Sequence, residues 1–279
     1  MDGSLTPVHM HLLPDSIRAR GLSTEEMRKA FLVQGLFRAD TISLRHIDLD
    51  RVVLGGAVPG SSALKLEAPE TFRAEFFCER RELGVLNIGG RGSVTVDGTR
   101  FNLDRLDVLY VARGSRDVQF DGKGARFYLV SYPAHETHPT THIAGAKAVG
   151  DPIGSAERAN ARKIAKYIHA DGAQSAQLVM GVTQLATGSV WNTMPAHTHF
   201  RRTEVYLYFD VPEDGVVVHL MGEPEETRHL IVRNEEVVLS PPWSIHSGCG
   251  TSNYTFCWAM GGENKDYTDM QAVDTRNLK

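Results

Sequence analysis

The stretch Ala196-His197-Thr198-His199-Phe200-Arg201-Arg202-Thr203-Glu204 decides how the rest of this sequence can be interpreted. Side chains alternate along a β-strand, so the imidazoles of His197 and His199 point to the same face. The carboxylate of Glu204 can converge on the same point, and His246 can join from a distant strand. Three nitrogens and one oxygen suit a divalent transition metal such as Zn, Fe, Mn or Ni, with a position left for substrate.

A second motif strengthens this interpretation. Pro241, Trp243 and His246 form the pattern Pro-x-Trp-x-x-His. Its pairing with the earlier His-x-His-x4-Glu resembles the two-part signature of the cupin barrels. A lone His-x-His is more often a pair of surface histidines, but Glu204 and the second motif favour a metal site. We therefore predict that His197, His199, Glu204 and His246 are metal ligands.

The composition bounds the class of protein. The chain has 279 residues, enough for one large domain or two small ones. Hydrophobic residues make up 42% and charged residues 23%, values that are ordinary for a soluble globular protein. The net charge of −4 implies no nucleic-acid or anionic-membrane partner. No run of about 18 apolar residues is present, so we expect no membrane-spanning helix.

Cysteine usage indicates the compartment. Cys78, Cys249 and Cys257 are odd in number and form no Cys-x-x-Cys pair, which argues against a disulfide framework. The N-terminus shows no basic segment followed by an apolar run, so no signal peptide is expected. We therefore expect a cytoplasmic protein. Cys249 follows His246 closely and is either a further ligand or, as we favour, a small buried residue.

The local patterns predict an all-β chain with a few short helices. A capping box at Ser23–Glu26 opens a helix that runs through Met27 and Phe31, and Ala156–Ala170 has helical composition. Asp97-Gly98, between two β-rich runs, is typical of a type I′ hairpin. Further strands are expected at residues 108–111, 125–130, 177–185, 205–209, 216–220, 230–232, 237–239 and 254–260.

The two halves of the chain repeat each other. Arg80-Arg81 matches Arg201-Arg202, and two later β-rich segments also match; those pairs are 92–96 with 215–219, and 107–111 with 236–240. These registers place Leu83 opposite Glu204 and Asp117 opposite His246. The alternative is a coincidence between β-rich segments.

We therefore predict two tandem cupin barrels, of the double-stranded β-helix or jelly-roll type. The first barrel, residues 1–145, is expected to lack a metal site. The second barrel, residues 146–279, is expected to bind the metal. The Pro/His/Thr/Gly-rich stretch 133–154 is the predicted linker.

Four blocks carry a more specific resemblance, at residues 80–90, 191–199, 222–229 and 240–248. Together they resemble the 5-keto-4-deoxyuronate isomerases (4-deoxy-L-threo-5-hexosulose-uronate ketol-isomerases) of pectin breakdown. The resemblance runs from about Ala30 to the C-terminus and is weakest over Met1–Ser16, which contains His9-x-His11. It implies a double-barrel cupin, one Zn²⁺ per chain on His197, His199, Glu204 and His246, and a homohexamer.

The family reaction interconverts 5-keto-4-deoxyuronate and 3-deoxy-D-glycero-2,5-hexodiulosonate, which moves a carbonyl from C1 to C2. A Lewis acid would stabilise the developing enediolate while a base moves the proton. The sequence identifies no base, so the catalytic residues stay unassigned. The substrate carries a carboxylate, for which a guanidinium is well suited. If the strand continues beyond His199, Arg201 faces the cavity as the substrate-binding residue and Arg202 faces out; a solvent-facing pair is the alternative.

Other polar residues near these motifs are open to two interpretations. Tyr206 and Tyr208 share the face of Glu204 and line either the pocket or the core. The cluster Glu226, Arg228 and His229 either caps the barrel mouth or is solvated, and the latter is favoured. His219 is expected to be a hydrogen-bonded histidine of the barrel interior, and the linker histidines are expected to be loop residues: His135, His138 and His142.

Two other functions use the same features. An Fe(II) cupin dioxygenase can have the same ligand set, since fold and ligands alone do not decide the chemistry. A non-catalytic, sugar-binding cupin is the third hypothesis, but a complete ligand set argues against it. We favour the isomerase because the four sequence blocks extend well beyond the ligands.

Overall fold

The computed structural model describes residues 10–279, and the chain divides into two compact units. Among the described residues, the first unit comprises residues 10–12 together with Leu36–Ala144. The second unit comprises Leu13–Gly35 and Gly145–Lys279. The change of unit at Ala144 lies next to the boundary predicted at residue 145. The segment Leu13–Gly35, however, belongs to the second unit although it lies within the range predicted for the first barrel.

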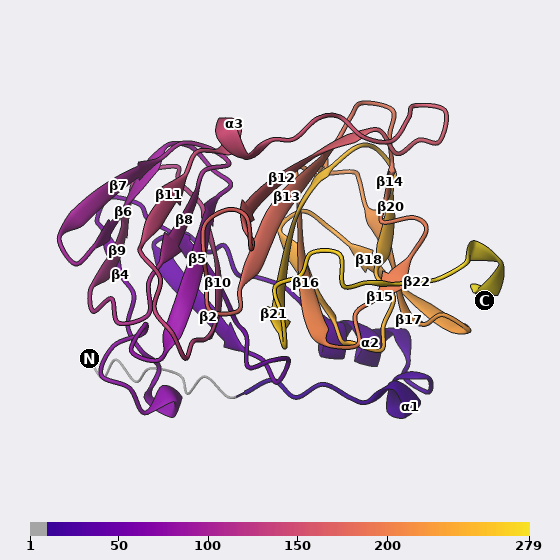
Figure 1. Cartoon of the computed structure of the whole chain (residues 1–279), viewed down its shortest axis with the longest axis horizontal. Helices are drawn as coiled ribbons and strands as arrows, with labels where there is room; N and C mark the ends of the chain where they lie inside the picture. The colour runs from indigo at the N-terminus through magenta and orange to yellow at the C-terminus, as the bar shows by residue number, and fades with distance from the viewer. Residues whose placement is uncertain (1–9) are drawn as a thin grey trace. The chain divides into compact units, whose positions relative to one another are not determined.

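The first unit is a pair of antiparallel sheets (Figure 1). The larger sheet has six strands in the order β11 (Thr141–Ile143), β8 (Val108–Val111), β5 (Arg81–Asn87), β10 (Phe127–Pro133), β3 (Val53–Val58) and β2 (Thr41–His46). The smaller has four strands in the order β4 (Leu64–Lys65), β9 (Val118–Asp121), β6 (Gly92–Val96) and β7 (Thr99–Leu103). Apolar side chains from both sheets, among them Leu83, Val94 and Phe127, form one buried core. A 3₁₀ turn at Glu70–Phe72 lies in the connection before β5.

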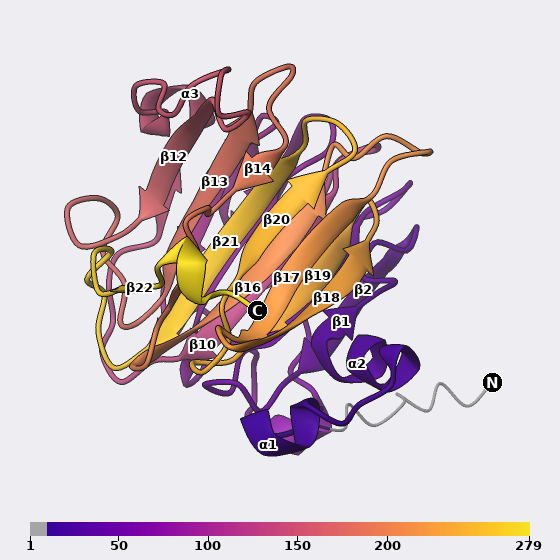
Figure 2. The same cartoon turned by 90° about the vertical axis from the view of Figure 1, so that its right-hand side faces the viewer.

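The second unit repeats this plan (Figure 2). Its larger sheet has the order β1 (Leu32–Val33), β19 (Glu236–Ser240), β16 (Arg202–Phe209), β21 (Thr255–Gly262), β13 (Val179–Leu185) and β12 (Arg162–Ile168). Its smaller sheet has the order β14 (Trp191–Asn192), β20 (Ser247–Gly250), β17 (Val217–Glu223) and β18 (Glu226–Val232). A two-stranded sheet joins β15 (His197–Thr198) to β22 (Gln271–Ala272), and a 3₁₀ turn at Thr275–Asn277 follows.

The internal repeat is visible in the strand order. β5 and β16 hold the same place in their sheets, and Leu83 and Glu204 are the third residues of these strands. Leu83 lies opposite Val111 on β8, just as Glu204 lies opposite Ser240 on β19. The registers predicted from the sequence repeat therefore match the strand pairing. Two similar pairs of sheets confirm the predicted fold of two tandem cupin-type barrels.

The N-terminal segment belongs to the second unit because its helices bury apolar side chains there. After the short helix α1 (Ser16–Ala19), helix α2 (Thr24–Phe31) begins with the predicted capping box, in which Ser23 and Glu26 satisfy each other's backbone N–H groups. Met27 and Phe31 are buried in the core of the second unit. The next two residues form β1, which pairs with β19 and extends that sheet.

Two local predictions have clear outcomes. The type I′ hairpin at Asp97-Gly98 is confirmed, since φ is +47° at Asp97 and +84° at Gly98. The helix predicted at Ala156–Ala170 is wrong: residues 162–168 form β12, paired with β13. The stretch has helix-forming residues but no helical apolar stripe, and pairing with β13 decides its structure. The only helix nearby is the short α3 (Gly145–Ala148), within the described part of the chain.

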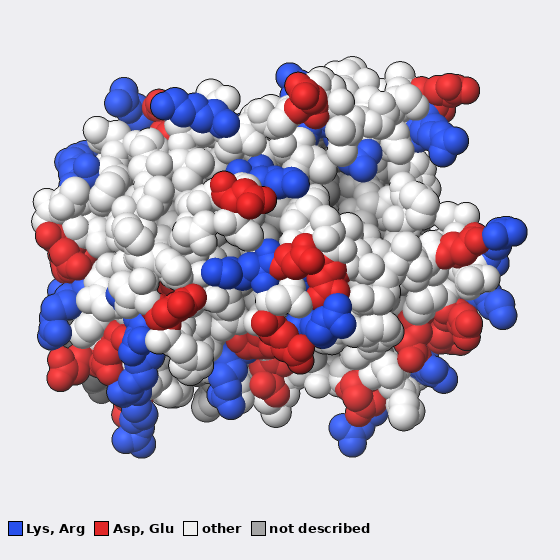
Figure 3. Space-filling model, viewed as in Figure 1, with Lys and Arg blue, Asp and Glu red and all other residues white. Residues whose placement is uncertain are grey.

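Two further observations concern the surface. No helix in residues 10–279 is long and apolar enough to cross a membrane. Figure 3 shows positive and negative side chains interspersed on the face it presents.

Candidate metal centre

The four predicted ligands come together in the second unit. One ligand atom of each of His197, His199, Glu204 and His246 lies within 4.8 Å of every other. His197 lies on β15, His199 in the turn that follows, and Glu204 on β16; His246 comes directly before β20. The sequence motif thus brings together residues that start from three strands. His199, Glu204 and His246 are buried, whereas His197 is partly open.

The donor atoms face one another at short distances. The Nε2 atoms of His197 and His199 are 3.1 Å apart, and those of His197 and His246 are 3.0 Å apart. Oε2 of Glu204 lies 2.9 Å from Nε2 of His246 and 3.2 Å from Nε2 of His199. Ligand atoms about 2.1 Å from a tetrahedral metal lie roughly 3.4 Å apart, so only a small expansion would admit a cation.

The far sides of two imidazoles are held by hydrogen bonds. Nδ1 of His199 donates to the backbone carbonyl of Asp269 at 2.8 Å. A carbonyl can only accept, so Nδ1 carries the proton and Nε2 directs its lone pair into the centre. Nδ1 of His246 lies 3.2 Å from Oγ of Ser240, the residue opposite Glu204 on β19. Such outer partners are typical of histidines that bind a metal.

The electrostatics favour the ligand forms of these groups. Burial, helped by the nearby His246, lowers the pKa of His197 to about 3, so this imidazole is neutral at neutral pH. Burial acts to raise the pKa of Glu204, but His246 and His199 outweigh it and hold the pKa below its ordinary value. Metal binding requires neutral imidazoles and an ionised carboxylate, so the donor set fits a divalent cation.

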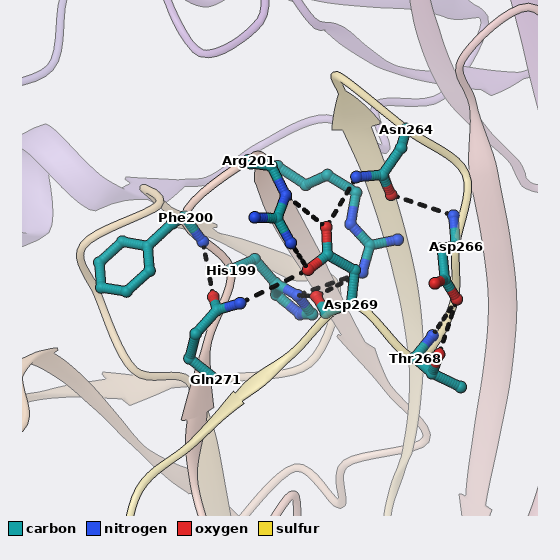
Figure 4. A network of polar contacts seen from close by, with 9 residues as sticks. His199, Phe200, Arg201, Asn264, Asp266, Thr268, Asp269 and Gln271 are labelled. Atoms are coloured by element: carbon teal, nitrogen blue, oxygen red, sulfur yellow. Dashed lines mark hydrogen bonds and ion pairs between the residues drawn. The ribbon is translucent and has the colours of Figure 1, made fainter.

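A polar network fixes the C-terminal segment beside His199 (Figure 4). The carbonyl of Asp269 also accepts from Nη2 of Arg202 at 2.9 Å. The carboxylate of Asp269 pairs with the guanidinium of Arg201, whose Nε is 2.9 Å away, and accepts from Nδ2 of Asn264 at 2.7 Å. Phe200 N–H donates to the side chain of Gln271 on β22. The segment from Asn264 to Gln271 is therefore tied to the turn that carries His199.

The predicted orientation of the two arginines is wrong. The side chain of Arg201 is 51% exposed and paired with Asp269, whereas Arg202 is 1% exposed. The expectation assumed one continuous strand, but β15 ends at Thr198 and β16 begins at Arg202. The intervening turn breaks the alternation of side chains, so Arg202 enters the interior and Arg201 faces solvent. Arg201, predicted to bind substrate, is not among the residues that line the cavity beside the centre.

A cavity of about 300 Å³ opens beside the centre. His197, His199 and Glu204 form part of its wall, and among the described residues that line it Arg162 is the one arginine or lysine. The remaining wall consists of Ile153, Ile164, Thr183, Thr193, Met194, Pro195, Tyr206, Phe256, Trp258, Met260, Tyr267 and Met270. A mainly apolar cavity with a few convergent polar groups is typical of a small-molecule site.

The tyrosines of β16 differ in their positions. Tyr206 lines the cavity, and its hydroxyl lies 3.4 Å from Oγ1 of Thr193. Tyr208 is buried deeper, and its hydroxyl lies 2.7 Å from Nδ1 of His219. His219 is therefore the hydrogen-bonded interior histidine that the sequence predicted.

The other polar clusters lie elsewhere. On β18, Glu226 and His229 are exposed, and Arg228 donates to the carbonyls of Ala19, Arg20 and Leu22, so it holds the N-terminal segment. In the first unit His142 is not a loop residue, since it lies on β11 and its Nε2 is 3.0 Å from Oδ2 of Asp107. His138 pairs with Glu136, and the carbonyl of His135 accepts from Arg113.

The sequence patterns did not single out three residues around the cavity and the centre: Arg162, Tyr267 and Asp269. Arg162 lies in the segment that was predicted to be a helix. Had that segment been predicted as a strand, the alternation of its side chains would have placed Arg162 on the same face as Ile164. Tyr267 and Asp269 lie in a segment without a motif, and only the pairing of β15 with β22 brings them to the centre. No local signal predicts such a long-range contact.

Comparison with known proteins places this geometry in a family. The model of the KduI/IolB family matches residues 35–276. The 4-deoxy-L-threo-5-hexosulose-uronate ketol-isomerase of Opitutus terrae is 49% identical over 274 residues, which cover 97% of this chain and 99% of that protein. The protein of the same name from Caldicellulosiruptor bescii is 51% identical over 264 residues, 93% of this chain and 96% of that one.

Solved structures support the fold. An IolB-like protein from Salmonella typhimurium LT2 has a TM-score of 0.72 at 14% identity, with 87% of this chain and 96% of that one covered. Oxalate decarboxylase of Bacillus subtilis, whose Mn(II) centres have been characterised, has a TM-score of 0.51 at 12% identity. The match covers 80% of this chain and 70% of the decarboxylase chain. The family match spans both barrels and all four converging residues, and we conclude that this chain belongs to the KduI/IolB family.

Proposed function

We propose that this chain is a metal-dependent ketol-isomerase that interconverts 4-deoxy-L-threo-5-hexosulose uronate and 3-deoxy-D-glycero-2,5-hexodiulosonate, a step of pectin and polygalacturonate degradation. The isomerase class rests on relatives of about 50% identity that bear this name over most of the chain. The observation that carries the proposal is the convergence of His197, His199, Glu204 and His246 at the wall of a cavity.

We assign one Zn²⁺ per chain to these four residues. Three imidazole nitrogens and a carboxylate oxygen suit zinc, and the adjoining cavity gives substrate access to it. When bound, the metal supplies a Lewis acid that stabilises negative charge on the oxygens at C1 and C2. Asp269 supports this assignment because its carbonyl fixes the proton of His199 on Nδ1. The zinc assignment itself rests on the family resemblance and the donor set.

The chain's own residues shape the reaction space. Phe256, Trp258 and Met260 give the cavity apolar walls, which limit the water that reaches the reacting carbons. Burial raises the pKa of Tyr206 well above its ordinary value, and burial also raises the pKa of Tyr267. Both phenols therefore keep their protons at neutral pH and serve as hydrogen-bond donors toward substrate oxygens. Neither is a base in its resting state.

A homohexamer and a cytoplasmic location complete the proposal. The family resemblance supports the first. Three free cysteines in the described residues support the second, since reduced thiols are typical of the cytosol.

The test is direct conversion of substrate. Zinc-loaded protein and, separately, Fe(II)-loaded protein are incubated with 4-deoxy-L-threo-5-hexosulose uronate while NMR follows the loss of the C1 aldehyde and the appearance of a C2 ketone, and an electrode records O₂. We expect conversion without O₂ uptake. Stoichiometric O₂ consumption would instead identify an Fe(II) dioxygenase, and binding without conversion would identify a non-catalytic sugar-binding cupin.

A further inference from the structure

Arg162 occupies an unusual place in the second unit. It is the first residue of β12, the last strand of the larger sheet, and it lines the cavity beside the candidate metal centre. The side chain is partly buried, and its Nη1 donates to the backbone carbonyl of Asn160 at 2.7 Å. Among the described residues this is the one hydrogen bond that the guanidinium makes, so most of its N–H donors have no protein acceptor.

The charge of Arg162 has no carboxylate counterpart among residues 10–279. No salt bridge of Arg162 is found in the described part of the chain, and its one electrostatic neighbour there is the phenol of Tyr267, which is not a carboxylate. Burial accordingly lowers the pKa of its guanidinium. Glu204, which is the one carboxylate that residues 10–279 contribute to the cavity wall, faces His199 and His246. By contrast, Arg201 is already paired with Asp269. A partly buried cation without a partner favours an anion in the adjoining space.

The sheet order separates this cation from the metal centre. Glu204 lies on β16, and β21 and β13 stand between it and β12. Three strand spacings of about 4.8 Å place the backbones of β16 and β12 roughly 14 Å apart. The distance between the functional groups of Glu204 and Arg162 is shorter, because both side chains extend into the cavity. An extended molecule with a reactive carbonyl at one end and an anionic group at the other fits this arrangement. A ligand with both groups on neighbouring carbons does not.

We propose that Arg162 binds the C6 carboxylate of the sugar acid and thereby places C1 and C2 at the four-residue centre. This inference rests on the proposed function and adds the residue that selects for a uronate. The planar guanidinium presents two N–H groups to the two carboxylate oxygens, a geometry that neither a hydroxyl nor an amide can use as well. Arg162 thus takes the role that the sequence analysis gave to Arg201.

The test compares an acid with its uncharged analogue. Wild type, Arg162→Met and Lys163→Met are assayed with 4-deoxy-L-threo-5-hexosulose uronate and with its C6 carboxamide. Lys163 is the matched control, because it is the next residue on β12 and is exposed. We expect Arg162→Met to lose about 10- to 150-fold in kcat/KM for the acid, the loss of a charge-assisted hydrogen bond. Its kcat/KM for the carboxamide should stay near the wild-type value.

A purely structural role of Arg162 predicts something different. It would lower kcat/KM for acid and carboxamide equally, and an unchanged acid-to-carboxamide ratio would overturn the inference. Arg162→Lys keeps the charge but not the planar fork, so its ratio should fall between those of wild type and Arg162→Met. If Arg162→Met does not fold, the ratios of wild type and Arg162→Lys decide. If the wild-type protein converts neither compound, the proposed function is refuted. If it converts both without preferring the acid, only the role of Arg162 is refuted.

Discussion

The side chain of Asp269 should control the affinity for metal although it is not a ligand. Its carbonyl accepts the Nδ1 proton of His199, and its carboxylate is held by Arg201 and Asn264. In Asp269→Ala the carboxylate contacts are lost, so the carbonyl is no longer fixed in place. His199 then loses the partner that orients its ring and defines its tautomer. Changes to such outer partners typically cost 10- to 100-fold in metal affinity, and we expect a loss of about that size.

The assay is competition for Zn²⁺ against a chelator of known affinity. Asp274→Ala is the matched control, since Asp274 also forms an ion pair with an arginine, Arg276, in the same C-terminal region. Asp269→Asn keeps the shape of the side chain and should fall between wild type and Asp269→Ala. At saturating zinc, Asp269→Ala should regain much of its activity, which separates weaker metal binding from damage to the fold.

One result would refute this reasoning. If the zinc affinity of Asp269→Ala equals that of Asp274→Ala and of wild type, the carboxylate does not position His199. The network of Figure 4 would then be a surface feature only.

Two further predictions concern stability. Burial lowers the pKa of His219 from 6.5 to about 3. Below pH 6.5 the unfolded chain therefore binds a proton at His219 that the folded state does not bind. The free energy of unfolding of the metal-free protein should fall by about 2 kcal/mol through this group between pH 7 and pH 5. In urea unfolding, the free energy of unfolding of His219→Gln should fall less between about pH 7 and pH 5 than that of wild type, by the amount given for His219. Equal losses in the two proteins would show that His219 is not the group responsible. Ser23→Ala removes the N-cap of α2 and should cost about 1 kcal/mol in the same assay, while Ser252→Ala, in a loop, should cost less. Equal costs would mean that the capping box contributes nothing.

The sequence predicts the fold and the convergence of His197, His199, Glu204 and His246 well, because both leave local, periodic signals. His197 and His199 are two residues apart, and Asp97-Gly98 has the positive φ angles that its hairpin requires. The repeat between the two halves can also be recognised in the sequence, since the Arg-Arg pairs lie beside or within β5 and β16, which hold the same place in their sheets. Strand alternation and turn chemistry act over a few residues and can be recognised without a structure.

The errors arise where contacts distant in sequence decide the outcome. Arg201 and Arg202 exchange their expected places because a turn interrupts the strand, and the motif does not show where β15 ends. The segment that contains Arg162 has helix-forming residues, but its pairing with β13 outweighs that tendency. Asp269 reaches His199 only through the pairing of β22 with β15. The residues that surround the centre are therefore less predictable than the four residues that converge on it.

The most direct test of the account is a titration of activity with metal. Metal-free protein is prepared by chelation, Zn²⁺ is added in small steps, and the rate of uronate isomerisation is measured at each step. We predict no activity without metal, a linear rise and a break at one Zn²⁺ per chain, with His246→Ala inactive throughout. Full activity in the metal-free protein, or a break at two Zn²⁺ per chain, would contradict a single catalytic centre formed by His197, His199, Glu204 and His246.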